Sequence, residues 1–122
     1  MTARTLPILA ALGLLATAAP ALAVDATTSD LRCLLALSAA EDAADGQMKP
    51  AMMAGVVYYL GRLDGRTPDL DLEAKAAAEL KAMSIQDLSD ETVRCGAALF
   101  ARGKAIEAIG EKLRGGALAA PK

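Results

Sequence analysis

Apolar residues recur along the chain with the spacing of helices rather than of strands. Four stretches show this spacing between turn signals: residues 30–44, 50–63, 69–83 and 89–114. No stretch alternates apolar and polar residues with enrichment in β-branched side chains, the pattern typical of a strand. We therefore expect an all-α fold, a small orthogonal bundle of four helices with an additional short helical turn.

Residues that favour helix ends separate these stretches. Asp45–Gly46 supplies a glycine for the left-handed conformation that closes many helices. Ser84 and Asp87 predict a short turn before the last helix, and Gly115–Gly116 is expected to stop that helix. The expected N-terminal caps are Thr28, Ser29 or Asp30 for the first helix, Asp69 or Asp71 for the third, and the triplet Ser89-Asp90-Glu91 for the fourth.

Residues 1–23 have the three parts of a secretory signal peptide. Arg4 gives a short positive start, residues 6–19 form an apolar run, and Ala21-Leu22-Ala23 matches a cleavage site with small residues at its outer positions. An uncleaved membrane anchor is the alternative, but an apolar run of about 14 residues is shorter than the roughly 20 that span a bilayer. We expect cleavage after Ala23.

After cleavage we expect a single helical domain over 24–114 and a flexible tail over 115–122. Losing Arg4 leaves 12 basic residues against 15 acidic ones. Because this mildly acidic chain has no basic stripe for phosphate contacts, we expect no nucleic acid partner. Charged residues interrupt every later apolar stretch, so no membrane contact is expected after cleavage. An alanine-rich exported chain of this kind indicates the periplasm, with secretion as the alternative.

Cys33 and Cys95 are the only cysteines, and an even number in an oxidising compartment favours one disulfide between them. A redox or metal pair is the competing interpretation, but the chain has no Cys-x-x-Cys spacing and no histidine. Two buried free thiols remain the other alternative. The disulfide would place the start of the first helix against the last helix, so we expect these two helices to cross.

Three glycines lie at intervals of seven inside the last predicted helix: Gly96, Gly103 and Gly110. They form one ridge within an apolar face, although each glycine costs a helix interior about 1 kcal/mol relative to alanine. Close packing against the second helix, which has its own Gly55 and Gly61, would offset this cost. The alternative is that the ridge is a groove for a partner helix or an apolar ligand.

The residue types needed for most catalysis are absent. The chain has no histidine and no tryptophan, and no serine lies in a nucleophile elbow. The acidic residues around 64–73 do not match the spacing of a calcium loop, and helix capping explains them. We therefore expect no enzymatic activity, no metal and no cofactor.

Two aromatic residues, Tyr58 and Tyr59, are adjacent in the second predicted helix. Because adjacent helical residues face different directions, we expect one tyrosine in the core, with its hydroxyl paired, and the other near the surface. Arg62 and Arg66 are expected to cover a helix end or pair with the acidic turn rather than bind an anion.

The order of these features resembles the HdeA-type periplasmic acid-stress chaperones. The resemblance covers residues 30–114 and is carried by Cys33, by Val56-Val57-Tyr58-Tyr59-Leu60-Gly61, and by Ser84-Ile85 leading to Thr92-Val93-Arg94-Cys95. It implies a small disulfide-bonded helical dimer that opens in acid and holds unfolding client proteins. The client surface would be Val56, Val57, Tyr58, Tyr59 and Leu60.

These observations lead to two functional expectations. The first is a small periplasmic binding or structural protein, in its most concrete form an acid-stress holdase whose partners are unfolded clients. Without histidine, its acid response must come from carboxylates that titrate near pH 4. The second is an interaction module that works while folded, using the glycine-lined face of the last helix to bind a periplasmic protein or a second copy as a homodimer.

Overall fold

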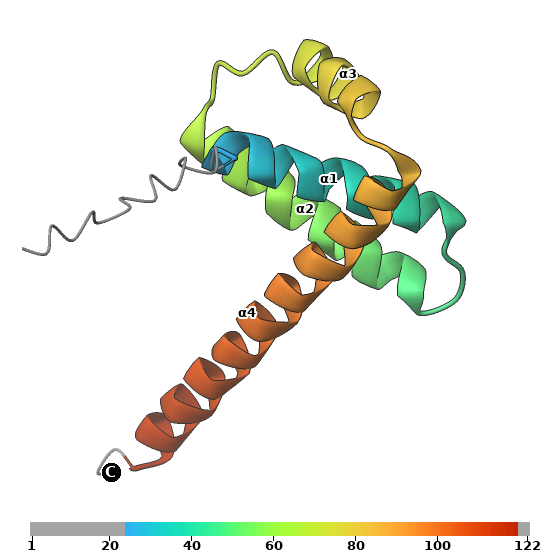
Figure 1. Cartoon of the computed structure of the whole chain (residues 1–122). Coiled ribbons are helices and arrows are strands. Elements are labelled where there is room, and N and C mark those ends of the chain that lie inside the picture. The colour runs from blue at the N-terminus through green and yellow to red at the C-terminus, as the bar shows by residue number, and fades with distance from the viewer. Residues whose placement is uncertain (1–23, 120–122) are drawn as a thin grey trace, which may run out of the picture.

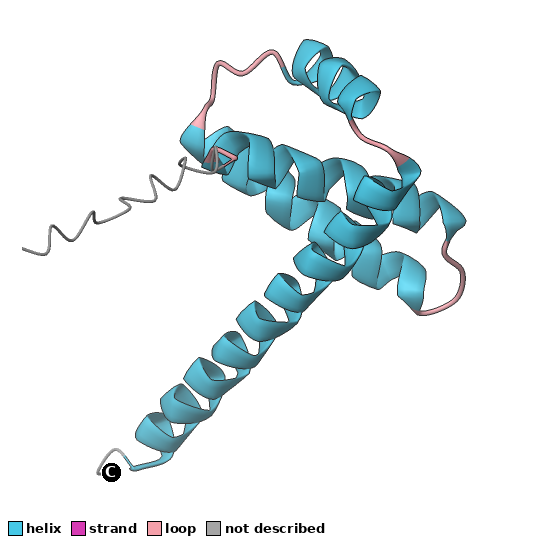
Figure 2. Ribbon diagram, in the orientation of Figure 1, coloured by secondary structure: helices cyan, strands magenta, loops and turns pink. Residues whose placement is uncertain are grey.

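The computed structural model describes residues 24–119 and is all-α in this range, with no strand (Figures 1 and 2). The helices are α1 (Ala26–Ala43), α2 (Met48–Arg66), α3 (Leu72–Ala82) and α4 (Ile85–Ala119). The predicted fold class is confirmed, while the signal peptide predicted for residues 1–23 lies outside the described residues. None of the described helices combines the length and the apolar content that crossing a membrane requires.

Helix α1 is the most buried element of the fold. It packs side by side with α2 in a helical hairpin, and the connecting turn uses Gly46 in the left-handed region with a φ of 53° (Figure 1). The core lies mainly between this hairpin and the first part of α4. Its buried members are Leu31, Cys33, Leu34, Leu37, Tyr59, Leu63 and Cys95.

Helix α4 crosses the hairpin with its first part and then extends away from it (Figure 1). The Cys33–Cys95 disulfide joins α1 to α4 with a Cα–Cα distance of 5.6 Å, and the Thr92 hydroxyl donates to the Ala36 carbonyl at 3.3 Å. The predicted disulfide and the predicted crossing of the first and last helices are both confirmed.

Helix α3 stands aside from the other helices and has no buried residue (Figure 1). Leu72 and Ala76 lie against the edge of the core, and Arg32 of α1 pairs with Glu79 at 2.5 Å. As predicted, Asp71 caps this helix by accepting from the Ala74 amide at 3.0 Å. These few contacts make α3 the most weakly attached element of the described chain.

Three predicted helix boundaries were wrong. The first helix begins earlier than expected because Asp25, not a residue at 28–30, accepts from the amides of Thr27 and Thr28. The Ser84 amide donates to the Asp87 carboxylate at 2.7 Å, and the Asp87 amide donates to the Ser84 hydroxyl at 3.1 Å. This reciprocal cap begins α4 itself, so no separate turn precedes the helix. Gly115–Gly116 does not stop α4, which continues to Ala119 because glycine lowers helix propensity without blocking the helix.

At Gly55, α2 lies close to side chains of both α1 and α4. A Cβ there would lie 2.7 Å from Leu99 Cδ1 and 2.8 Å from Leu37 Cδ1, inside the core. We expect Gly55→Val to lower the free energy of unfolding by about 1–3 kcal/mol, because a larger side chain overpacks this site. Gly61→Ala on the same helix, where a Cβ meets nothing within 4 Å, should raise stability by about 0.5–1 kcal/mol. Urea unfolding of both variants tests this, and equal effects would contradict the close contact.

Candidate functional site

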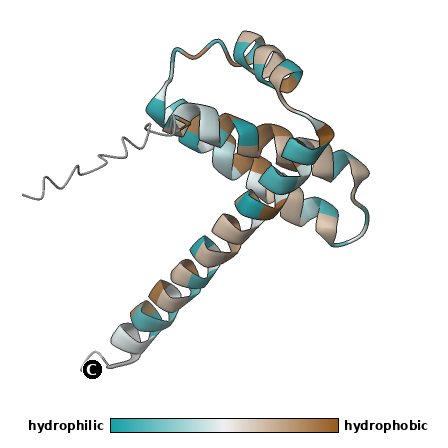
Figure 3. Cartoon of the chain, in the orientation of Figure 1, coloured by the Kyte–Doolittle hydropathy of each residue, from teal (hydrophilic) through white to brown (hydrophobic). Residues whose placement is uncertain are grey.

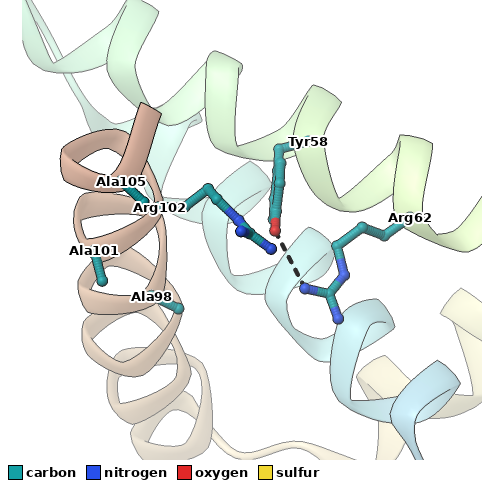
Figure 4. A pocket seen from close by; sticks show the side chains of 6 residues that line it. All are labelled: Tyr58, Arg62, Ala98, Ala101, Arg102 and Ala105. Atoms are coloured by element: carbon teal, nitrogen blue, oxygen red, sulfur yellow. Dashed lines mark hydrogen bonds between the residues drawn. The ribbon is translucent and has the colours of Figure 1, made fainter. Parts of the chain in front are cut away.

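A groove of about 400 Å³ lies where α4 leaves α2 (Figure 4). One wall is formed by Tyr58 and Arg62 of α2, and the other by α4. The α4 wall consists of small side chains and one long basic one: Ala98, Ala101, Arg102 and Ala105. Alanines at these positions keep the α4 backbone close to the groove and leave room between the helices.

Two arginines from different helices converge on one hydroxyl in this groove. Arg62 donates to the Tyr58 oxygen at 3.2 Å, and Arg102 reaches toward the same ring from α4 (Figure 4). Hydrogen bonds from these two guanidinium groups, first Arg62 and then Arg102, lower the pKa of Tyr58. The hydrogen bond to Tyr58 is also the largest cause that raises the pKa of Arg62. The groove is therefore an electropositive site.

A buried carboxylate fixes the α2 side of this groove. Asp30 of α1 is 4% exposed and accepts from Arg62 Nε at 3.1 Å and from Arg66. Arg66 also donates to the Ala26 carbonyl at 3.0 Å. Arg62 and Arg66 were expected to cover a helix end or to pair with the acidic turn. The pairing with the acidic turn is wrong: both pair with Asp30, because they lie one helical turn apart and face α1.

The stretch from Val56 to Leu60 is divided between core and surface. Tyr59 is buried at 3% exposure and its hydroxyl lies 3.5 Å from the Cys95 carbonyl, while Tyr58 is half-buried beside Arg62. The expected division of the two tyrosines is confirmed, and burial raises the pKa of Tyr59. Val56 and Leu60 pack against the core, so Val57, at 61% exposure, is the member most open to solvent.

The part of α4 from Phe100 onward, which we call the arm, extends away from the hairpin, and only its first residues, among them Ala101, Arg102 and Ala105, line the groove opposite α2 (Figure 1). Its large apolar side chains are exposed, and Figure 3 shows apolar bands continuing along it. They are Phe100 at 69%, Ile106 at 61%, Ile109 at 56% and Leu113 at 69% exposure. These four residues give the arm an exposed apolar surface.

Of the five glycines expected to pack helices together, only Gly55 does so within the described chain. Added Cβ atoms at Gly61, Gly96 and Gly103 would meet nothing within 4 Å, and one at Gly110 would meet only the Arg114 side chain of the same helix. The reason is that α4 leaves the hairpin near Leu99, so the later glycines face open space.

One further cluster of ligand atoms, found in the described residues, is Cys33, Cys95 and Glu91. Its two sulfurs are bonded to each other, so they are not the thiolates that bind metal ions. The cluster is the disulfide with a neighbouring carboxylate, which pairs with Arg94.

Sequence reasoning missed Arg102. Thr92, Leu99, Ile106 and Leu113 recur every seven residues, and Cys95, Arg102 and Ile109 form the companion series. A single arginine inside an otherwise uncharged seven-residue pattern was the available signal.

Comparison with known proteins adds no relative: no family model, curated protein or solved structure matches the chain.

Proposed function

We propose that the protein is an exported interaction module that works while folded and binds a helix of a partner protein along its arm. The observation that carries this proposal is the exposed apolar stripe of Ile106, Ile109 and Leu113 on a helix that has left its own core. Export to the periplasm is part of the proposal. It is supported by a disulfide between helices, a bond typical of oxidising compartments.

The stripe continues the face by which α4 already packs against the hairpin. Thr92, Cys95 and Leu99 contact α1 and α2, and the same seven-residue series runs on to Ile106, Ile109 and Leu113. A face with this spacing is suited to packing against another helix. Gly103 and Gly110 border it and let a partner backbone approach closely.

The charges of the arm favour an acidic partner. Between residues 100 and 116 the chain has four basic and two acidic residues, and one pair, Lys104 with Glu107, lies at 2.9 Å. The remaining excess is basic, with Arg102, Lys112 and Arg114 near the apolar stripe. The partner helix would therefore carry glutamate or aspartate beside its apolar face. A second copy of the arm has the same basic excess, so self-pairing is less favoured.

The test uses two synthetic amphipathic helical peptides with the same leucine stripe, flanked by glutamates in one and by lysines in the other. We expect the glutamate peptide to bind at neutral pH. Ile106→Asp or Ile109→Asp should weaken this binding at least about tenfold, since each removes an aliphatic side chain that the bound peptide would bury. Ala108→Asp, on the opposite face of the arm, is the matched control and should bind as the wild type does. Fluorescence anisotropy measures all four proteins.

Equal binding of the two peptides, or unchanged binding by both isoleucine variants, would refute the proposed surface or its charge preference. Size-exclusion chromatography over a range of concentrations addresses the homodimer. A dimer that Ile106→Asp dissociates would make a second copy the partner of the same surface.

The acid-stress holdase is the second candidate, and the ion pairs between helices favour it. Asp30, Glu79 and Glu41 each pair with a basic residue, and protonation removes such pairs. Hydrogen bonds from Thr28 and Ser84 lower the pKa of the capping residues Asp25 and Asp87 below the ordinary 3.8. The two caps therefore stabilise the folded state fully above about pH 4. Their contribution to the free energy of unfolding is lost as the pH falls through the lowered pKa of each carboxyl group.

Acid would then release α3 and loosen α2 while the disulfide keeps α1 joined to α4. The exposed surface would include Val56, Tyr59 and Leu60. In the holdase, light scattering of an aggregating client should fall only after acidification, and the isoleucine variants of the arm should act like the wild type. The folded module predicts the opposite: binding at neutral pH that depends on Ile106.

A further inference from the structure

The groove between α2 and α4 has a surplus of positive charge. Its charged lining residues are Arg62 and Arg102, and it has no carboxylate among its lining residues. Asp30, behind it, is shared by Arg62 and Arg66, so one negative charge faces two positive ones. Arg102 has no ion pair among the described residues. The site is therefore basic although the chain as a whole is acidic.

Both arginines of the groove retain donor groups that have no ion-pair partner among the described residues. Arg62 uses Nε for Asp30 and one terminal nitrogen for Tyr58, which leaves its other terminal nitrogen without a described partner. Arg102 approaches from the opposite wall, with Tyr58 between the two guanidinium groups (Figure 4). Planar guanidinium groups present paired N–H donors whose spacing matches a carboxylate.

The rest of the groove is apolar and small. Ala98, Ala101 and Ala105 offer methyl groups and no free donor, and helical hydrogen bonds occupy their backbone amides. A carboxylate on an apolar chain can use both the arginine donors and these methyl groups, whereas a phosphate has no apolar part to place against them. We propose that this groove binds a carboxylate attached to a short apolar group, held by Arg62 and Arg102 across the Tyr58 hydroxyl.

The site is held in place before any ligand arrives. Asp30 fixes the Arg62 side chain, while Gly55 and the disulfide fix α4 against the hairpin close to the groove. Such a carboxylate could be a small free acid or the side chain or C-terminus of a peptide. The chemistry recognised is the same in both cases, and the site goes beyond the apolar surface of the arm.

The experiment titrates the disulfide-bonded protein with sodium butyrate, following backbone amide signals of α2 and α4 by NMR. Butyramide, which has the same shape without the charge, is the matched control ligand. We expect butyrate to bind, butyramide not to bind, and Arg102→Gln to weaken butyrate binding by about fivefold or more, because a charge-assisted hydrogen bond is lost at a partly exposed site. Arg114→Gln, farther along the arm, should leave binding unchanged.

A second measurement identifies the position of the ligand. Butyrate brings a negative charge to the two arginines, so it should raise the pKa of Tyr58, which absorbance of the tyrosinate reports. Binding with this shift supports the proposal, as does tighter binding of an acetylated glutamate peptide, which would make a protein the source of the carboxylate.

Equal binding of butyrate and butyramide would show an apolar groove without anion recognition and would overturn the proposal. No binding of butyrate, or binding only of inorganic phosphate, would overturn it as well. Ile109→Asp separates this site from the arm, because residue 109 lies two helical turns beyond Arg102 and that variant should bind butyrate normally even where helix binding is lost.

Discussion

Replacing both cysteines by alanine is expected to lower the free energy of unfolding by about 4 kcal/mol. The Cys33–Cys95 bond closes a loop with a sequence separation of 62, and the loop-entropy relation gives this magnitude for the restriction of the unfolded chain. The loss is large because the core has few large side chains and α4 meets the hairpin only over its first part. Urea unfolding of the Cys33→Ala/Cys95→Ala variant and the oxidised wild type measures the difference.

The reduced wild type is the internal control for this prediction. It should unfold at nearly the same urea concentration as the double alanine variant, because both lack the cross-link while retaining small apolar groups at these positions. A loss below about 1 kcal/mol would show that the unfolded chain is already compact, or that packing alone holds α4 against α1.

Asp30→Asn should be the next most damaging change, with an expected loss of about 2–3 kcal/mol. The variant leaves Arg62 and Arg66 facing a buried neutral amide, and removing one member of a buried ion pair is costly. We place the loss below that of a fully buried pair because the arginine side chains are 39% and 36% exposed. Thermal and urea unfolding at neutral pH provide the measurement.

The exposed Asp42 lies on the same helix, so Asp42→Asn is the matched control, with an expected change within about 0.5 kcal/mol. The double variant Asp30→Asn/Arg66→Gln should lose less than the sum of the two single variants, because the three side chains form one network. Additive losses, or equal losses at positions 30 and 42, would contradict a shared network around Asp30.

Local signals along the chain were sufficient for much of the fold. Helical periodicity predicted the four helices, Asp71 was among the predicted caps, and Gly46 was expected in the turn after the first helix. The disulfide followed from having two cysteines, and with it the crossing of α1 and α4. Such features depend on a few neighbouring residues or on one covalent bond.

The candidate site was much less predictable. Arg62 was expected to cover a helix end or pair with the acidic turn, but its partner is Asp30, which is 32 residues away in the sequence. Arg102 was not identified, because its importance arises only when α4 lies beside Tyr58. The glycine ridge was expected inside the bundle, yet most of it lies on the arm.

The sequence by itself determined the helices, the Asp71 cap, the cross-link and the balance of charge, because periodicity, local capping and composition depend on a few residues. Tertiary structure alone decided which faces are covered. Helix α4 has 35 residues and is about 52 Å long, whereas α1 and α2, with 18 and 19 residues, form a hairpin about 28 Å long. Helix α4 also crosses this hairpin instead of running parallel to it (Figure 1). Part of α4 must therefore remain unpacked, and this geometry creates both the arm and the arginine groove at its base.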